Sequence, residues 1–127
     1  MTTPERDLTE LLRTLRVYEH AGLWVYETTD EAPQLEGSIF WFREREGWSQ
    51  IRPATSRDDA TQLWVWLELA VYSDLHAIGF LAHVSAALTA AQIPCNVIAA
   101  YHHDHLFVPA SDRERALDVL RALSATP

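Results

Sequence analysis

The stretch CNVIAAYHHDHLFVPA, residues 95–110, decides the fold. Two apolar runs, residues 95–101 and 105–109, enclose a short polar cluster of histidine and aspartate. This pattern predicts two strands joined by a hairpin. An earlier run, TQLWVWLELA at residues 61–70, has the period of two that is typical of a strand. The second half of the chain therefore contains at least three strands.

Two predicted helices flank the hairpin. The segment FLAHVSAALTAAQI, residues 80–93, carries one apolar stripe, formed by Phe80, Val84, Ala87, Leu88 and Ala91. The segment SDRERALDVLRAL, residues 111–123, opens with a capping box of Ser111 and Glu114. The order from residue 61 is thus strand, helix, strand, strand, helix. One further strand completes the βαββαβ pattern, in which an antiparallel sheet carries both helices on one face.

The first half of the chain can supply that further strand. Residues 4–16 space their leucines as one helical face, and residues 22–29, 38–45 and 48–52 are rich in residues typical of strands. The dipeptide Glu46-Gly47 predicts a turn between the last two. We therefore expect one helix and about three short strands before residue 61.

One face of the strand at residues 61–70 carries two tryptophans. Val65 and Leu67 belong to its apolar face, whereas Trp64 and Trp66 share the other face with Glu68. Two exposed tryptophans would be costly on a monomer surface. This face is therefore expected to contact either the N-terminal half of the chain or a second subunit.

Composition restricts the class of protein. The chain has 127 residues, of which 48% are hydrophobic, which suits one compact unit. Its net charge of -8 disfavours binding to nucleic acid or anionic lipid. No run is long enough to span a membrane, and the polar start lacks the apolar core of a signal peptide. The lone Cys95, expected to be a buried structural thiol, fits a reducing compartment, so we expect a cytoplasmic protein.

The segment SDLHAIGFLAHVSAALTAAQIPCNVIAAY, residues 73–101, resembles the ACT domain. The ending YHHDHLFVPASDRERALDVLRAL and the REREGWSQI hairpin are similar to small bacterial proteins with one abbreviated and one complete ACT unit. The resemblance implies an α+β, ferredoxin-like βαββαβ fold with an abbreviated unit at residues 1–57 and a complete unit at 58–127. It also implies a homodimer with a regulatory role, which binds an amino acid without catalysis and without a cofactor.

The resemblance places the ligand at the loop 73–79, beside the predicted hairpin. A glycine before a helix lets backbone approach a ligand, and free first-turn amides favour a carboxylate. The ending Asp-His-x-x-Val-Pro also resembles the last ACT module of the cytosolic arginine sensor, which implies that Asp104 meets a polar or basic group. Ala77 stands where that sensor carries an acidic residue, so the resemblance implies no specific amino acid. The expected ligand-binding residues are Ser73, Asp74, His76, Ala77, Ile78, Gly79, Asn96, Val97 and Asp104.

Two other functions remain open from the sequence. His102, His103 and His105 could bind a metal ion, although in an extended strand only His103 and His105 share a face, about 6.6 Å apart. Alternatively, the tryptophan face and a sheet edge could serve as a protein-interaction module without a ligand.

Overall fold

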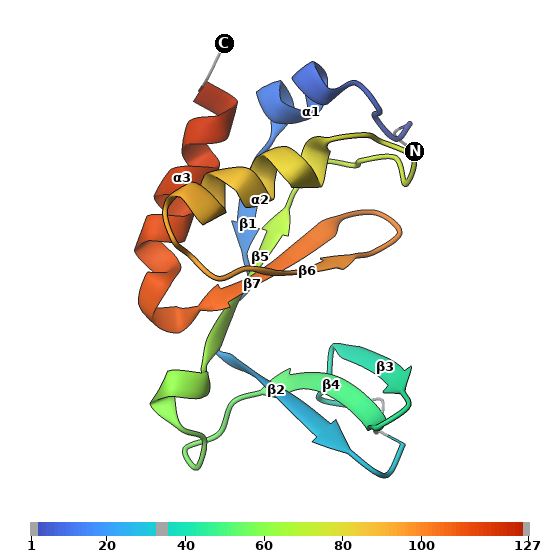
Figure 1. Cartoon of the computed structure of the whole chain (residues 1–127), viewed down its shortest axis with the longest axis vertical. Coiled ribbons are helices and arrows are strands. Elements are labelled where there is room, and N and C mark those ends of the chain that lie inside the picture. The colour runs from blue at the N-terminus through green and yellow to red at the C-terminus, as the bar shows by residue number, and fades with distance from the viewer. Residues whose placement is uncertain (1–2, 33–35, 126–127) are drawn as a thin grey trace.

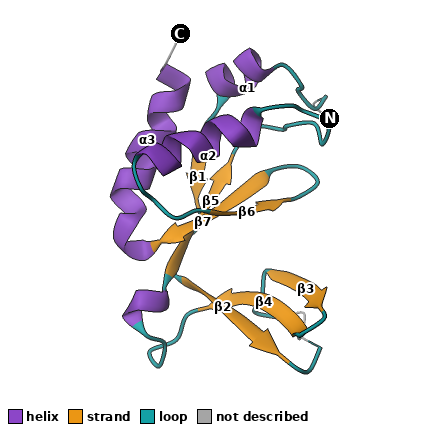
Figure 2. Ribbon diagram, viewed as in Figure 1, coloured by secondary structure: helices purple, strands orange, loops and turns teal. Residues whose placement is uncertain are grey.

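A single antiparallel sheet runs through the chain in this computed structural model, which describes residues 3–32 and 36–125 (Figures 1 and 2). The helices are α1 (Leu8–Thr14), α2 (Phe80–Ala90) and α3 (Arg113–Ala125). The strands are β1 (Val17–Glu19), β2 (Trp24–Thr29), β3 (Phe40–Glu44), β4 (Gly47–Pro53), β5 (Trp64–Leu69), β6 (Asn96–Ala99) and β7 (Asp104–Pro109).

The C-terminal half forms the predicted ferredoxin-like unit. Strand β5 pairs with β7, which pairs with the edge strand β6, and all pairings are antiparallel. The missing strand is β1, which pairs with the free side of β5 through Val17 opposite Leu69. The sequence predicted no strand at residues 17–19, yet the N-terminal half does supply the strand that completes the sheet.

Helices α1, α2 and α3 cover one face of this sheet (Figure 2). The strand alternation places Val65, Leu67 and Leu69 on that face, together with Leu106 and Val108 of β7. The predicted stripe of α2 packs on them through Phe80, Val84 and Leu88, while Leu11 of α1 and Leu15 directly after it add to the core. The main core therefore lies between the helices and the sheet, as the two periodicities predict.

The opposite face of the sheet is aromatic. We call the surface formed by Trp64, Trp66, His105 and Phe107 the aromatic face. It meets the curled meander of β3, β4 and β2, which joins β5 through a single pairing of Trp24 with Trp64. Edge contacts between Trp24 and Trp66, with ring centroids 5.2 Å apart, tie the two parts together. Of the two partners expected for the tryptophans, the structure selects the N-terminal half of the same chain.

Local details at two positions complete the fold. The predicted turn at Glu46-Gly47 is present, and Gly47 has a φ of 138°. The predicted capping box is not formed, because Ser111 lies inside a 3-10 turn, Ala110–Asp112, and the Glu114 carboxylate accepts a hydrogen bond from Arg113.

Among the described residues, no helix is long and apolar enough to cross a membrane.

Candidate functional site

A small cavity lies where the loop after β5 meets the start of α2 and the end of β6. We call it the Gly79 cavity; its volume is about 160 Å³. Five expected ligand-binding residues line it: Ser73, Asp74, Ala77, Gly79 and Asp104. The other lining residues, which were not among the expected ligand-binding residues, are Leu75, Phe80, Leu81, Ala82, Ala99 and Ala100. The loop and the hairpin strand therefore meet at one site although they are about 25 residues apart in the sequence.

Asp104 is the buried acidic residue that lines this cavity. Its side chain belongs to the helix-covered face of β7, and the residue is only 7% exposed. The Ser73 hydroxyl donates a hydrogen bond of 3.2 Å to Oδ2. Burial raises the pKa of the Asp104 carboxyl, while the Ser73 hydrogen bond and the nearby His105 and His103 act in the opposite direction. A carboxylate with one neutral partner in this position favours an incoming cation or hydrogen-bond donor.

Gly79 joins the loop to α2 in a left-handed conformation, with a φ of 90°. No side chain caps the helix at this position, and its first turn contains no acidic residue. The first amide groups of a helix lack intrahelical acceptors, so they are available to a ligand carboxylate. The residues of this first turn, Phe80, Leu81 and Ala82, line the cavity beside Gly79.

Asp74 stabilises the loop rather than standing free. Its Oδ1 accepts a hydrogen bond of 2.7 Å from the His76 amide, and Oδ2 lies 3.2 Å from Nε of Arg6. The His76 amide hydrogen bond, followed by the Arg6 guanidinium, holds the pKa of Asp74 below its ordinary value. The chain near Glu5 pairs with the loop, since the Asp74 amide donates to the Glu5 carbonyl at 2.9 Å. No sequence signal indicated that the N-terminal segment would close this loop.

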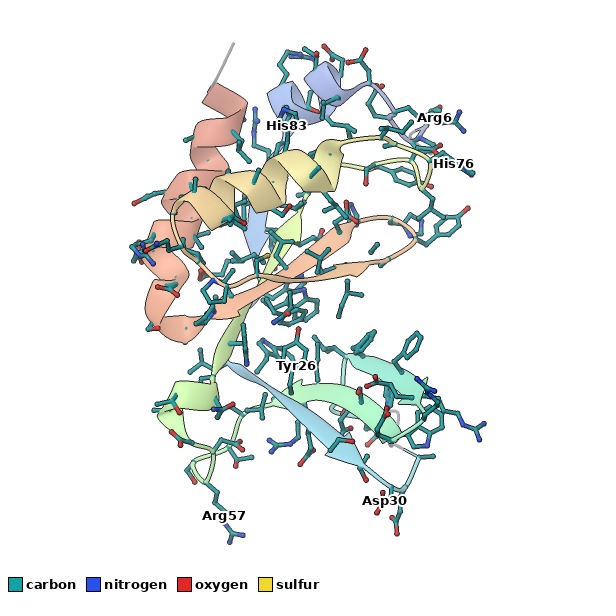
Figure 3. The ribbon with its side chains drawn as sticks, viewed as in Figure 1. Arg6, Tyr26, Asp30, Arg57, His76 and His83 are labelled. Carbon is teal, nitrogen blue, oxygen red and sulfur yellow. The ribbon has the colours of Figure 1, made fainter. Side chains whose placement is uncertain are left out.

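His76, Ile78, Asn96 and Val97 lie outside the Gly79 cavity. His76 lines a neighbouring cavity of about 230 Å³ with Arg6, and Figure 3 shows both at the same end of the molecule. Ile78 is 86% exposed. Asn96 and Val97 line a third cavity, on the meander side of the sheet, with Tyr26 and Phe40.

The strand register explains the position of Asn96. Asp104 pairs with Ala99, whereas Asn96 pairs with Phe107 three residues further along β7. Side chains alternate along a strand, so Asn96 and Asp104 belong to opposite faces of the sheet. Asn96 and Asp104 therefore do not share one cavity.

The histidines of the hairpin also separate. His102 is exposed, with its ring beside those of Tyr101 and Tyr72. His103 lies with Nδ1 3.6 Å from Oε2 of Glu68, and His105 belongs to the aromatic face. The structure therefore does not bring His102, His103 and His105 together as three ligands of one ion.

A different set of possible metal ligands converges on the aromatic side. Ligand atoms of His20, Glu68 and His105 all lie within 4.8 Å of one another. Sequence reasoning did not name His20 or Glu68 as ligands. The pairing of Glu68 directly opposite His105 would have indicated part of this set, but it depends on the register between β5 and β7.

Cys95 shows the properties expected of a structural thiol. It packs against the core, and burial raises the pKa of its thiol to about 11. A nucleophilic cysteine requires the thiolate near neutral pH. The position therefore disfavours nucleophilic catalysis at Cys95.

Two structures resemble this chain in fold. A crystal structure of a protein of unknown function from Vibrio cholerae, described as a possible transport protein, has a TM-score of 0.75 and 33% identity, over 87% of this chain and 91% of that chain. A crystal structure of a protein from Agrobacterium tumefaciens has a TM-score of 0.68 over 87% of this chain and 89% of that chain. At 18% identity, this second likeness concerns the fold alone.

Sequence comparison agrees with the fold. No protein with a curated description matches this chain. Two family models, both described as the ACT domain, match residues 3–64 and residues 65–122. Because these matches follow one another along nearly the whole chain and the sheet has the ferredoxin-like order, the chain belongs to the ACT domain family.

Proposed function

We propose that this protein is a non-catalytic regulatory module that binds an amino acid in the Gly79 cavity. Membership in the ACT domain family supports a regulatory, ligand-binding role. The observation that carries the proposal is Asp104, a buried carboxylate that lines a cavity and has one neutral hydroxyl donor. A buried charge usually has an ionic or multiple hydrogen-bonding partner, and a bound ligand would supply it.

The cavity suits a small zwitterion. Its volume of about 160 Å³ lies below the range of about 300–1,000 Å³ that is typical for drug-sized ligands. We assign the ligand carboxylate to the first-turn amides of α2 at Gly79. We assign an ammonium group of the ligand, either the α-amino group or a basic side chain, to Asp104. Asn96, on the opposite face of the sheet, has no part in this arrangement.

Regulation would follow from the elements that meet at the cavity. Ser73 and Asp74 belong to the loop that the N-terminal segment closes, and Asp104 belongs to the central sheet. A ligand that contacts both parts stabilises their closed arrangement, because a ligand shifts an equilibrium through its differential affinity for two states. The assignment of residues 1–57 and 58–127 to an abbreviated and a complete unit belongs to this proposal.

Assembly and location also belong to the proposal. We infer a homodimer formed through a sheet edge or through helices, since β6 and β3 each have one strand neighbour. The aromatic face no longer supports this inference, because the meander of the same chain contacts it. Sedimentation at micromolar concentration tests the dimer, and a monomer would contradict it. We place the protein in the cytoplasm because its lone cysteine suits a reducing compartment.

Isothermal titration calorimetry against each proteinogenic amino acid tests the binding proposal. We expect at least one to bind, and Asp104→Asn to weaken its binding by about 10- to 100-fold, the value of a charge-assisted hydrogen bond. Asp118→Asn is the matched control, because Asp118 is exposed on α3, and it should bind like the wild type. Absence of heat with all amino acids, or equal binding by Asp104→Asn, would contradict the proposal.

A further inference from the structure

We propose that His20, Glu68 and His105 form a binding site for a divalent transition-metal ion such as Zn²⁺, on the face of the sheet opposite the Gly79 cavity. The three side chains come from separate parts of the chain: the segment after β1, the strand β5 and the strand β7. We call them the His20 cluster. Two imidazoles and one carboxylate are the ligand set of many three-ligand zinc sites.

The distances suit one ion. Nε2 of His20 lies 2.9 Å from Oε1 of Glu68, and one ligand atom from each of the three residues lies within 4.8 Å of the other two. Ligand bonds of about 2.0–2.2 Å in a tetrahedral site separate neighbouring ligand atoms by about 3.4 Å. Closing the cluster around an ion therefore requires side-chain shifts smaller than about 2 Å.

In the described part of the chain, the Glu68 carboxylate forms no ion pair with an arginine that would compete with a metal ion. Glu68 pairs with His20 and, at 3.6 Å, with Nδ1 of His103. Both partners are imidazoles, which carry a charge only when protonated. An ion would replace the contact between His20 and Glu68 with bonds to both groups, and a water molecule can occupy the fourth position.

The rings of the cluster are held in place by neighbouring aromatic groups. His20 stacks on Trp66 with ring centroids 3.5 Å apart and an angle of 4° between the planes. Tyr18 meets the edge of the same ring at 4.7 Å. Side chains that are fixed before binding lose less conformational entropy when they coordinate an ion.

Trp66 opposes binding in one specific way. Its indole Nε1 donates a hydrogen bond of 2.9 Å to Nδ1 of His105. An indole N–H can only donate, so Nδ1 is unprotonated and the neutral ring carries its proton on Nε2. A metal ion at Nδ1 takes the position of the Trp66 N–H directly. A metal ion at Nε2 leaves the ring proton on Nδ1, which then can no longer accept the hydrogen bond from Trp66. Binding thus removes one hydrogen bond.

Zinc titration of the full-length chain, purified without a histidine tag, tests the proposal by calorimetry and elemental analysis. We expect one equivalent of Zn²⁺ and a change in tryptophan fluorescence as Trp66 loses its acceptor. Glu68→Gln should weaken binding by at least about 10-fold, because it replaces an anionic ligand with a neutral amide of similar shape. Trp66→Phe should tighten binding by about 2- to 10-fold, because the hydrogen bond lost on coordination is already absent.

His83→Gln and His102→Gln are the matched controls, since both histidines are exposed and lie outside the His20 cluster. Both should bind zinc like the wild type. Substoichiometric zinc, unchanged binding by Glu68→Gln, or equal loss in a control would overturn the site. Trp66→Phe that binds no more tightly would remove His105 from the ligand set and overturn the three-ligand proposal. The amino-acid titration is independent, because the two sites share no residue.

Discussion

The substitution Asp104→Asn tests whether the protein maintains a destabilising charge for its ligand. Without a ligand, the buried Asp104 carboxylate has the Ser73 hydroxyl, 3.2 Å away, as its hydrogen-bond donor. A buried polar group that is incompletely paired costs about 1–3 kcal/mol, and more when it is charged. Asparagine keeps the shape and an acceptor oxygen but cannot ionise. We therefore expect it to raise the free energy of unfolding by about 1 kcal/mol at neutral pH.

The effect must depend on pH with a defined sign. Burial raises the pKa of Asp104 above its ordinary value of 3.8, so folding favours the protonated form. The stabilisation contributed by this group is fully present below the unfolded-state pKa and is lost as the pH rises through the folded-state pKa. The difference between the variant and the wild type should therefore be largest at neutral pH and become smaller toward pH 4.

Urea denaturation at pH 7 and at pH 4 measures this difference. At an m value of about 2 kcal/mol/M, a gain of 1 kcal/mol shifts the midpoint by about 0.5 M at pH 7. Ser73→Ala should have the opposite effect, because it removes the hydroxyl donor to Asp104. It should lower the urea midpoint more at pH 7, where the carboxyl is ionised to a greater extent, than at pH 4. A wild type more stable than Asp104→Asn at pH 7, or a difference that is equal at both pH values, would refute the reasoning.

Three further measurements test other parts of the structure. Gly47→Ala should lower the free energy of unfolding by more than about 2 kcal/mol, because φ is 138° and a Cβ would lie 2.9 Å from the Thr29 carbonyl oxygen. Gly79→Ala should lower the free energy of unfolding by only about 1–2 kcal/mol, the backbone strain of a left-handed alanine, because the atom nearest to its Cβ would be 3.6 Å away. Equal urea midpoints for Gly47→Ala and Gly79→Ala would contradict this ranking. Cys95 is partly buried, and its pKa is raised from 9.0 to about 11, so it should react with a thiol reagent at pH 8 about 100-fold more slowly than in the unfolded chain. Equal rates would contradict the raised pKa. Leu106→Ala should lower the unfolding free energy by about 2–5 kcal/mol in urea denaturation, because Leu106 is fully buried, and a loss below 1 kcal/mol would contradict its place in the core.

The two proposed sites use consecutive residues of β7. Asp104 lines the Gly79 cavity on the helix side, and His105 joins the His20 cluster on the aromatic side. Alternation along a strand sends neighbouring side chains to opposite faces. A shift of β7 by one residue would exchange the two faces, so both sites depend on the same register.

Much of the fold was predictable because its signals are local. The alternation in β5 and the apolar stripe of α2 identified the strand and the helix, together with the faces that form the core. Strand β1 was missed because three residues are too few for a period to be recognised. The capping box at Ser111 was wrong because a 3-10 turn precedes α3 and Glu114 interacts with Arg113.

The chain by itself determined the order of strands and helices from β2 onward, the family, and most of the polar residues proposed for the amino-acid site. The tertiary structure alone decided which polar residues meet. It brought Ser73 and Gly79 to Asp104, separated Asn96 from them, and gathered His20 and Glu68 around His105. The physical reason is that periodicity depends on neighbours in the sequence, whereas these contacts depend on pairings between distant strands, whose register the packing of the whole core determines.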